Sequence, residues 1–501
     1  MQTRFKRHKL RVFVVYKNIY NDLNKEMSGI LTTGKLVLTN TTSNQDAFDR
    51  LRVSQTYTMY DVATIYDSSP HRLDTFVNGT GAVTHDSKTG VITLSANAST
   101  NAVAIQQSYR YISYQFHKSR IVLLSGTLRN ETSTAEHYCR TRVGLFDGTA
   151  EKGIYQNGVT NPNGATGPGN GHYFELVSAG NGSTDIMFVV ERRGKVDGVG
   201  AELETETRIE QTNWNIDKFN GGGPSGFTIS SWRNSAFVFV IDQQWGAGRV
   251  RFGLYICGTL YYMHHLTHAA IGVPAPNGTY NPGPIIIPYI RYPKLPIRSE
   301  LKTTSDAGQA ASMSMMCMSV MSESGREPAE NPRSLSWPFS DTKAIPTATG
   351  FIPLLSFTLP PVEPANRITL SLTNFAISST GTNSSLMWSL IQHPRGSLVG
   401  ATYSTISSYS HALYNSNGSS TFTNGVIDAS TFLISNGANG IVLDSGILAS
   451  DGNISKNYLY ASEVGVDSFI SGEPKVLTIA VRSLTGTQQC SATLSWIEIK
   501  N

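Results

Sequence analysis

The chain consists of short apolar or alternating runs separated by residues that favour turns. Runs rich in Val, Ile, Phe, Tyr and Thr recur from residue 29 onward, for example at 90–97, 119–128 and 236–245. Branched and aromatic side chains pack well on a pleated sheet, and Gly, Asn, Pro and Ser between the runs favour turns. Residues 249–252 alternate polar and apolar, as in a half-buried strand. We therefore predict strands throughout, and little helix because no long window keeps a helical stripe.

A polar segment of small residues, with prolines near its end, lies between about residues 300 and 353, and strand-like runs resume after it. Many strands at this spacing are typical of sandwiches and jelly rolls. We predict an all-β chain with two tandem antiparallel β-sandwich, jelly-roll-like domains. The predicted division is a basic N-terminal extension and extended arm at 1–54, a large sandwich at 55–300, an interdomain linker at 301–344 and a C-terminal sandwich at 345–501.

Charged residues are scarce: Asp, Glu, Lys and Arg make up 15% of the chain, against about a quarter in an average soluble protein. This composition excludes charge-driven disorder and long coiled coils. The 40 basic and 36 acidic side chains leave a net charge of +4, which is too small for a protein that wraps nucleic acid, so no nucleic-acid partner is expected. Lys and Arg gather in the first 25 residues, which leaves the predicted sandwiches nearly neutral.

The N-terminal residues do not form a convincing signal peptide. Their apolar run at 12–16 is short, and no small-residue cleavage site follows it. Residues 1–26 are therefore either an upstream extension of the reading frame or a basic arm that docks on a neighbour. No segment approaches the ~18 apolar residues of a membrane span. The scattered cysteines favour a reducing compartment without disulfides: Cys139, Cys257, Cys317 and Cys490.

Two clusters contain residue types that bind metals. His264, His265 and His268 could ligate zinc. On a strand, however, His264 and His268 lie far apart and no carboxylate is near in sequence, so we favour a packing or surface role. The second cluster holds soft sulfur groups that could bind Cu(I). Because methionine also fills apolar contacts and the run lies in the predicted linker, we favour contact with a neighbouring domain or subunit. Its members are Cys317 with Met313, Met315, Met316, Met318 and Met321.

Two further patterns suggest other chemistry. The glycines at 221–223 resemble a phosphate loop, but the Lys-Ser/Thr that must follow is missing, so a tight turn between strands is favoured. Glu202, Glu204 and Glu206 would share one face of a strand. A glycosidase needs two carboxylates at a defined separation, which the sequence does not establish, so a solvated face is favoured.

No known catalytic motif stands out, although the abundant Ser and His leave a convergent triad open. We assign no catalytic, cofactor-binding or metal-binding residues and expect no cofactor. Asn-x-Ser/Thr sequons, many of them expected by chance in so Asn- and Ser-rich a chain, occur at Asn40, Asn78, Asn97, Asn130, Asn181, Asn277, Asn383, Asn417 and Asn453.

A set of segments carries a resemblance to a known family: DAFDRLRVSQTYTMYD at 46–61, residues 108–128, WNIDKFNGGGPSGFTIS at 214–230, residues 239–269 and PKLPIRSEL at 293–301. Together they resemble virion structural proteins of large icosahedral double-stranded DNA viruses and some tailed phages, with "AFGRLRVS"-like and "WNIDKLDGTGPSG"-like segments. Asp49 and Ser299 depart from that pattern, where Gly and Tyr are usual. The resemblance spans about 46–301, with a looser match of the C-terminal sandwich, and implies a minor capsid or fibre-type role without catalysis.

We therefore expect a non-enzymatic virion protein, a minor capsid or capsid-surface component that holds neighbouring subunits together. Its expected partners are the major capsid protein, neighbouring minor capsid proteins and other copies of itself. Residues 1–54 and 302–344 would make intersubunit contacts, so deletion of 1–54 should leave a folded protein that no longer enters particles. The alternative is a fibre or tail adhesin that binds host glycans through aromatic rings such as Trp232, Tyr280 and Tyr289. A glycan-degrading enzyme is the third possibility.

Overall fold

The computed structural model describes most of both predicted sandwiches. The described residues are 29–32, 35–38, 55–97, 102–115, 118–130, 138–147, 170–179, 185–193, 205–244, 248–267, 290, 293–303, 310–323, 333–338, 343–346, 350–360, 368–381, 385–416, 420–422, 440–449, 451–458, 465–466, 470 and 474–500. Within them the helical elements are two 3₁₀ turns, η1 (Gln211–Asn213) and η4 (Arg395–Ser397). A helix able to cross a membrane is not found in this part of the chain.

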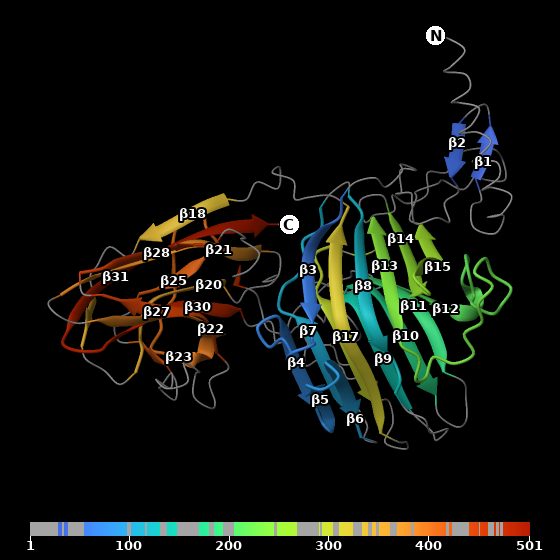
Figure 1. The fold of residues 1–501 in the computed structure, drawn as a ribbon, viewed down its shortest axis with the longest axis horizontal. Coiled ribbons are helices and arrows are strands. Elements are labelled where there is room, and N and C mark those ends of the chain that lie inside the picture. The colour runs from blue at the N-terminus through green and yellow to red at the C-terminus, as the bar shows by residue number, and fades with distance from the viewer. Residues whose placement is uncertain are drawn as a thin grey trace, which may run out of the picture.

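The first sandwich has two antiparallel sheets (Figure 1). The seven-stranded sheet runs in the order β12 (Thr205–Glu210), β11 (Ile186–Arg193), β10 (Gly171–Ala179), β9 (Tyr138–Phe146), β16 (Ile297–Thr303), β7 (Val103–Ser108) and β4 (Leu73–Asn78). The eight-stranded sheet runs in the order β15 (Thr259–Thr267), β14 (Arg249–Ile256), β13 (Phe237–Gln244), β8 (Arg120–Thr127), β17 (Ala311–Ser322), β6 (Val91–Ala96) and β5 (Gly81–Asp86), and β3 (Tyr57–Ala63) also pairs with β17.

The core of this sandwich lies between the two sheets. Alternate residues of each strand face it, such as Val143 and Leu145 of β9 against Phe239 and Ile241 of β13. The Phe174 ring of β10 packs against the Phe239 ring, with centroids 5.0 Å apart. The residues between these core positions therefore lie on the outer faces of the sheets.

The second sandwich is also built from two antiparallel sheets. One sheet runs β18 (Arg333–Pro338), β31 (Gln488–Lys500), β21 (Ile368–Thr380) and β28 (Asn453–Asn457), with β19 (Lys343–Ile345) on β31 and β29 (Gly465–Val466) on β21. The other runs β24 (Ser404–Thr405), β25 (Leu413–Asn415), β20 (Ile352–Thr358), β30 (Lys475–Ser483), β22 (Leu386–Pro394) and β27 (Ile441–Leu448). Its core includes Phe375, Trp388 and Trp496. Two further short pairs are β1 (Gly29–Thr32) with β2 (Lys35–Leu38), and β23 (Leu398–Val399) with β26 (Thr421–Phe422). The predicted all-β, two-sandwich class is confirmed.

The predicted linker at 301–344 is wrong for most of the residues that the structure describes there. β17 lies inside the eight-stranded sheet, between β8 on one side and β6 and β3 on the other. β18 pairs with β31 of the second sandwich. The alternating Ser and Met residues of β17 form a half-buried strand, whose small polar residues made it resemble a connector in the sequence. The predicted arm at 1–54 lies outside the described residues, apart from β1 and β2.

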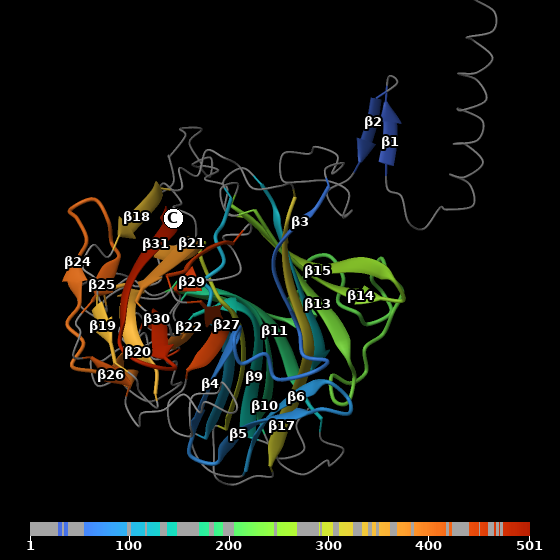
Figure 2. The same cartoon turned by 60° about the vertical axis from the view of Figure 1, so that its left-hand side comes forward.

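The two sandwiches touch at the β4 and β7 edge of the seven-stranded sheet (Figure 2). Ile470 of the second sandwich is buried against Val103, Ile105 and Phe76, which lie on the outer face of that sheet. The backbone N–H of Ile470 also donates to the Asp74 carboxylate at 2.7 Å. The contact combines apolar packing with a hydrogen bond to a carboxylate, so it holds the two domains in a defined orientation.

Candidate functional site

The outer face of the seven-stranded sheet carries a row of charges, here called the charged face. It comprises Arg140 and Arg142 of β9, Glu175 of β10, Arg208 of β12, and Arg298, Glu300 and Lys302 of β16. Glu175 stands directly opposite Arg142, and Arg142 stands directly opposite Glu300. Residues that face each other across antiparallel strands have Cβ atoms about 5 Å apart. The strand register therefore places the base Arg142 between the acids Glu175 and Glu300.

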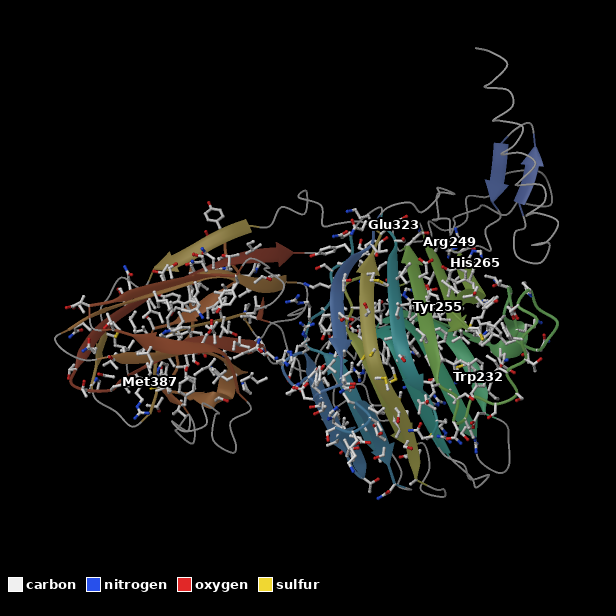
Figure 3. The ribbon with its side chains drawn as sticks, viewed as in Figure 1. Trp232, Arg249, Tyr255, His265, Glu323 and Met387 are labelled. Atoms are coloured by element: carbon white, nitrogen blue, oxygen red, sulfur yellow. The ribbon has the colours of Figure 1, made fainter. Side chains whose placement is uncertain are left out.

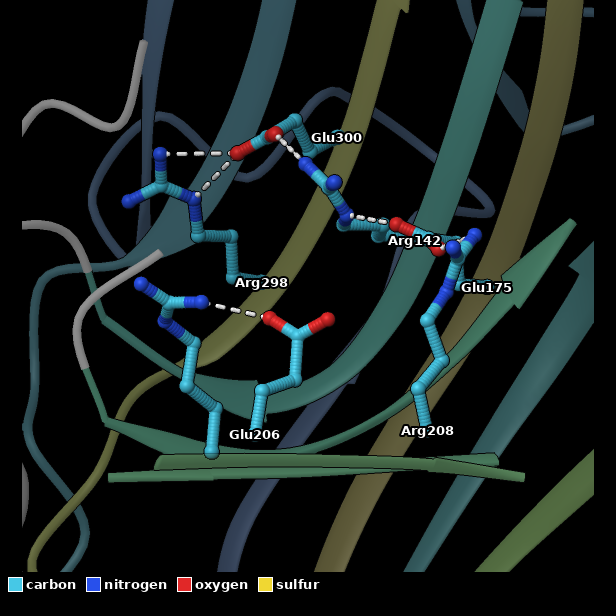
Figure 4. Close-up of polar contacts among 7 residues, drawn as sticks. Arg142, Glu175, Glu206, Arg208, Arg298 and Glu300 are labelled. Carbon is cyan, nitrogen blue, oxygen red and sulfur yellow. Dashed lines mark hydrogen bonds and ion pairs between the residues drawn. The ribbon is translucent and has the colours of Figure 1, made fainter. Parts of the chain in front are cut away.

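Ion pairs connect five members of the charged face into a chain (Figure 4), in the order Arg208, Glu175, Arg142, Glu300 and Arg298. Arg142 donates from Nε to Glu175 Oε2 at 2.5 Å and from Nη1 to Glu300 Oε1 at 2.8 Å. Arg208 pairs with the other oxygen of Glu175. Arg298 donates to Glu300 Oε2 from Nε at 3.1 Å and from Nη2 at 2.9 Å. Each carboxylate therefore bridges two guanidinium groups.

Aromatic rings fill the spaces between these charges. The Arg298 guanidinium lies 5.5 Å from the Phe146 ring centroid, and that of Arg208 lies 3.8 Å from the Phe188 centroid. Both are cation–π distances. Gly144 allows β9 to lie close to the β10 backbone, since a Cβ at Gly144 would meet Tyr173 Cα at 2.6 Å. The strand sequence thus alternates charged residues with flat rings on this face.

Burial makes these charges energetically important. Arg142, Glu175, Arg298, Glu300 and Lys302 are each at most 2% exposed. Burial raises the pKa of Glu175, but the Arg142, Arg208 and Arg140 guanidinium groups outweigh it and hold that pKa below its ordinary value. Burial also lowers the pKa of Lys302 to about 8, which the neighbouring Arg142 and Arg140 favour and Glu300 opposes. A carboxylate and a lysine, both with lowered pKa values, therefore share one buried face.

A second buried polar group lies between the sheets. The Arg120 guanidinium of β8 donates to Gln243 Oε1 and to the carbonyls of Ile112 and Pro293. The Gln243 amide nitrogen lies 3.2 Å from His172 Nδ1, and His172 Nε2 lies 3.1 Å from Glu191 Oε1. All four side chains are at most 1% exposed, so this group joins the two sheets rather than meeting a ligand.

The outer face of the eight-stranded sheet differs, because much of it is uncharged and partly exposed. One cross-strand row consists of Tyr255, Val238, Ser125, Cys317 and Ala63. Leu123, Ile121 and Met321 occupy the same face in the two neighbouring rows and are also partly exposed. Tyr255 is 39% exposed and projects from β14 (Figure 3). We call Tyr255, Val238, Leu123, Ile121, Cys317 and Met321 the apolar face.

The segment at 214–230 protects the edge of this sheet. Its backbone N–H groups at Ile216 and Asp217 both donate to the Met263 carbonyl of the edge strand β15, at 3.1 Å. Asp217 in turn accepts from the backbone N–H of Phe219 and Ser225, both at 2.8 Å. An unpaired strand edge invites aggregation, and this segment covers it.

The predicted histidine cluster serves this same cap. His264 Nδ1 accepts the Asn215 backbone N–H at 3.1 Å, and the His265 backbone exchanges hydrogen bonds with the Asn215 side chain. His268 lies outside the described residues. Burial, aided by His265, lowers the pKa of His264 to about 4. Among the described residues no group of three or more His, Cys, Asp or Glu could hold a metal ion.

The methionine run packs inside the first sandwich instead of bridging domains. Met313, Met315 and Met318 are buried in its core, whereas Met316 is 36% exposed. The favoured contact with a neighbouring domain or subunit is therefore wrong for the three buried residues. Cys317 lies partly exposed on the opposite side of β17, and all four cysteines of the chain are free.

Two other predicted features are the glycine run at 221–223 and the alternating glutamates at 202–206. The glycines at 221–223 lie in a loop that the Gly221 N–H to Phe227 carbonyl bond closes and in which the Gly226 N–H to Gly223 carbonyl bond forms a turn. A turn is present, as favoured, but it is flanked by the isolated bridge between Asn220 and Thr228 instead of by two strands. Glu206 is exposed and pairs with Arg192 at 2.5 Å. Glu202 and Glu204 lie outside the described residues.

Trp232 was expected to be an exposed glycan-stacking ring, and this is wrong. It is 4% exposed, packs against Trp214 and Phe237, and donates from Nε1 to Gln211. Its partners come from other segments of the chain, so the local sequence gave no sign of its burial. Tyr280 and Tyr289 lie outside the described residues.

Sequence reasoning missed the charged face. A signal was present, since Arg142 lies inside TRVGLF and Arg298, Glu300 and Lys302 lie inside IRSELK. Charges at alternate positions of an otherwise apolar strand indicate either a solvated face or buried partners. The choice between them depends on strand register, which brings together residues 158 positions apart.

Comparisons with known proteins identify no family: no family model and no curated protein matches the chain. Among solved structures, a legume lectin-like domain from Entamoeba histolytica shares 10% identity over 50% of this chain and 89% of its own, with a TM-score of 0.28. Peanut lectin in complex with a nine-residue peptide shares 12% identity over 54% and 98%, with a TM-score of 0.29. A protein of unknown function from Shewanella oneidensis MR-1 shares 11% identity over 58% and 93%, with a TM-score of 0.30. Similarities at this level carry no functional conclusion, and the fold assignment rests on the sheets themselves.

Proposed function

We propose that this chain is a non-enzymatic structural protein of a virus particle, which binds a neighbouring coat protein through the apolar face. The observation that carries the proposal is the apolar face itself. Its central row crosses five strands without a charged residue, and several of its side chains are partly exposed. Interface centres are depleted of charge and enriched in aromatic side chains and Met, which fits Tyr255 and Met321.

The sequence resemblance supports the same proposal in a specific way. The resembling segments at 108–128 and 239–269 supply β8 and most of β13–β15, and thereby Leu123, Ile121 and Tyr255 of the apolar face, whereas Cys317 and Met321 lie on β17, outside these segments. The segment at 214–230 caps the edge of that sheet, and the segment at 293–301 supplies the Pro293 carbonyl that Arg120 of β8 binds. Four of the resembling segments thus lie in or beside the eight-stranded sheet, and the one at 293–301 contributes most of β16 to the seven-stranded sheet.

A charge placed on the apolar face tests the proposal. We expect Leu123→Glu to fold normally but to enter particles at least tenfold less, because a desolvated carboxylate without a partner opposes association. Thr84→Glu on the exposed edge strand β5 of the same sheet is the matched control and should incorporate normally. Normal incorporation of Leu123→Glu would show that the apolar face makes no coat contact.

Glycan attachment is a second candidate, favoured by the Tyr409 loop of the second sandwich. Tyr409 is 68% exposed among Ser and Thr residues. The loop is anchored, since the Glu498 carboxylate accepts the hydrogen bonds of Ser410 Oγ and the His411 N–H. An exposed flat ring on an anchored loop suits stacking against a sugar. On a glycan array, Tyr409→Ala should lose the binding that the wild type shows. Tyr66 is 91% exposed on the other sandwich, so Tyr66→Ala is the control and should still bind. A wild-type protein that binds no glycan on the array rules this candidate out.

A further inference from the structure

The buried part of the charged face has more cations than carboxylates. Among the described residues, Arg142, Arg298 and Lys302 are fully buried there, against the two carboxylates Glu175 and Glu300. The half-buried Arg140 and Arg208 add to the positive charge. Burying an ion without a counter-charge costs several kcal/mol, so an excess of cations on a buried face needs a compensating anion.

The excess is concentrated at one point. Lys302 of β16 stands directly opposite Arg140 of β9, on the same face. Lys302 is 1% exposed, and no hydrogen-bond acceptor among the described residues reaches its Nζ. The buried Nε of Arg140 likewise has no acceptor in the described part of the chain. Two orphaned donors of like charge therefore stand side by side.

The surrounding residues limit what can neutralise this pair. Both oxygens of Glu300 are already engaged by Arg142 and Arg298, and both oxygens of Glu175 by Arg142 and Arg208. The next residue in the Lys302 row is Val103, which packs against Ile470 of the second sandwich. The neighbouring carboxylates are thus occupied, and the side of the pair toward β7 is apolar.

We propose that Lys302 and Arg140 form a binding site for an oxyanion, a sulfate, phosphate or carboxylate group, beside the contact between the two sandwiches. An ammonium and a guanidinium at adjacent register positions supply charge-assisted hydrogen bonds to such a group. Its negative charge would balance the cation excess of the face. The site is independent of the proposed coat contact, which lies on the other sheet.

Thermal unfolding of the full chain in chloride buffer, with and without sodium sulfate, tests the site. We expect sulfate to raise the Tm of the wild type saturably, by about 2–4 °C, and to leave Lys302→Met with at most the small linear effect of a general salt. Lys343→Met is the matched control, because Lys343 is a partly buried lysine of the second sandwich whose Nζ donates to the Pro353 carbonyl at 2.7 Å. It should respond to sulfate as the wild type does.

The direction of the Tm change that Lys302→Met causes in chloride buffer gives a second readout, which does not depend on the affinity for sulfate. An uncompensated buried lysine destabilises the fold, so Lys302→Met should have a higher Tm than the wild type without sulfate. At saturating sulfate this difference in Tm should shrink or change sign. Equal sulfate responses of wild type and Lys302→Met overturn the proposal. Replacing sulfate by glucuronate, with glucose as the neutral control, distinguishes the source: a rise with glucuronate but not glucose assigns the site to a sugar carboxylate, and a rise with sulfate alone to an inorganic oxyanion.

Discussion

Among single residues, Arg142 has the largest expected effect on the first sandwich, because two buried carboxylates depend on it. Its guanidinium binds both Glu175 and Glu300, and all three side chains are nearly inaccessible to water. Removing one partner of a buried ion pair leaves an uncompensated charge and costs more than the pair itself contributes. Glu175 and Glu300 therefore depend on Arg142 to remain buried as charged groups.

We expect Arg142→Met to lower the free energy of unfolding by about 3–5 kcal/mol. Glu206→Gln breaks the more exposed pair with Arg192 on the same sheet and should cost at most about 1 kcal/mol. Urea unfolding of both variants gives the comparison. Equal costs would mean that burial of the Arg142 pairs has no energetic consequence.

A second residue-scale expectation concerns pH and His264. The folded pKa of His264, about 4, lies below the ordinary value of 6.5, so the unfolded chain binds more protons between these two values. Its contribution is fully present above about pH 6.5 and is lost as the pH falls toward 4, because protonated Nδ1 no longer accepts the Asn215 N–H. His264→Gln should lose less stability than the wild type over this window. If the urea midpoints of the wild type and of His264→Gln fall in parallel from pH 7 to pH 4, His264 is not the group responsible for this loss of stability.

At the scale of elements, the sequence predicts strands well where one side chain in two faces the core. The alternation at 249–252 lies within β14, as expected, but the strand is not half-buried, because Arg249 and Arg251 are buried as well as Val250 and Phe252. β17 has the same alternation, but with Ser and Met in place of charged and branched residues, so its composition resembles that of a linker although its periodicity is that of a strand. The ion pairs of the charged face could not be predicted, since they depend on which strands become neighbours across 33 to 158 residues of sequence.

The position of β17 in the sheet predicts stability effects of different size for Met316 and Met318, which lie two positions apart. Met318 is 2% exposed in the core, so Met318→Ala should cost about 2–5 kcal/mol. Met316 is partly exposed, and Met316→Ala should change stability by no more than about 0.5 kcal/mol. Chemical denaturation measures both. A small stability cost of Met318→Ala would contradict the core position of Met318 and would favour a connector role for residues 311–322.

At the scale of the whole molecule, the contact through Ile470 couples the two sandwiches. Ile470 is 1% exposed, against Val103, Ile105 and Phe76. The Asp74 carboxylate that accepts its N–H has a pKa raised by burial, against the opposing effect of the hydrogen bonds from Ile470 and Thr75. Placing a charge in this apolar contact should separate the domains without unfolding either.

We expect Ile470→Asp to increase the radius of gyration in small-angle scattering while the circular dichroism spectrum stays unchanged. Val399→Asp, at a position 55% exposed on the second sandwich, should scatter like the wild type. An unchanged radius of gyration for Ile470→Asp would mean that the domain orientation does not depend on this contact.

We propose that this chain is a structural component of a virus particle, bound through the apolar face of its eight-stranded sheet. A density map of the purified particle, with this chain traced in it, tests that claim most directly. We expect the chain at repeated positions in the shell, with Tyr255, Leu123 and Met321 buried against a neighbouring coat protein. Absence of the chain from the particle, or a map in which the apolar face meets solvent at every copy, would contradict the account.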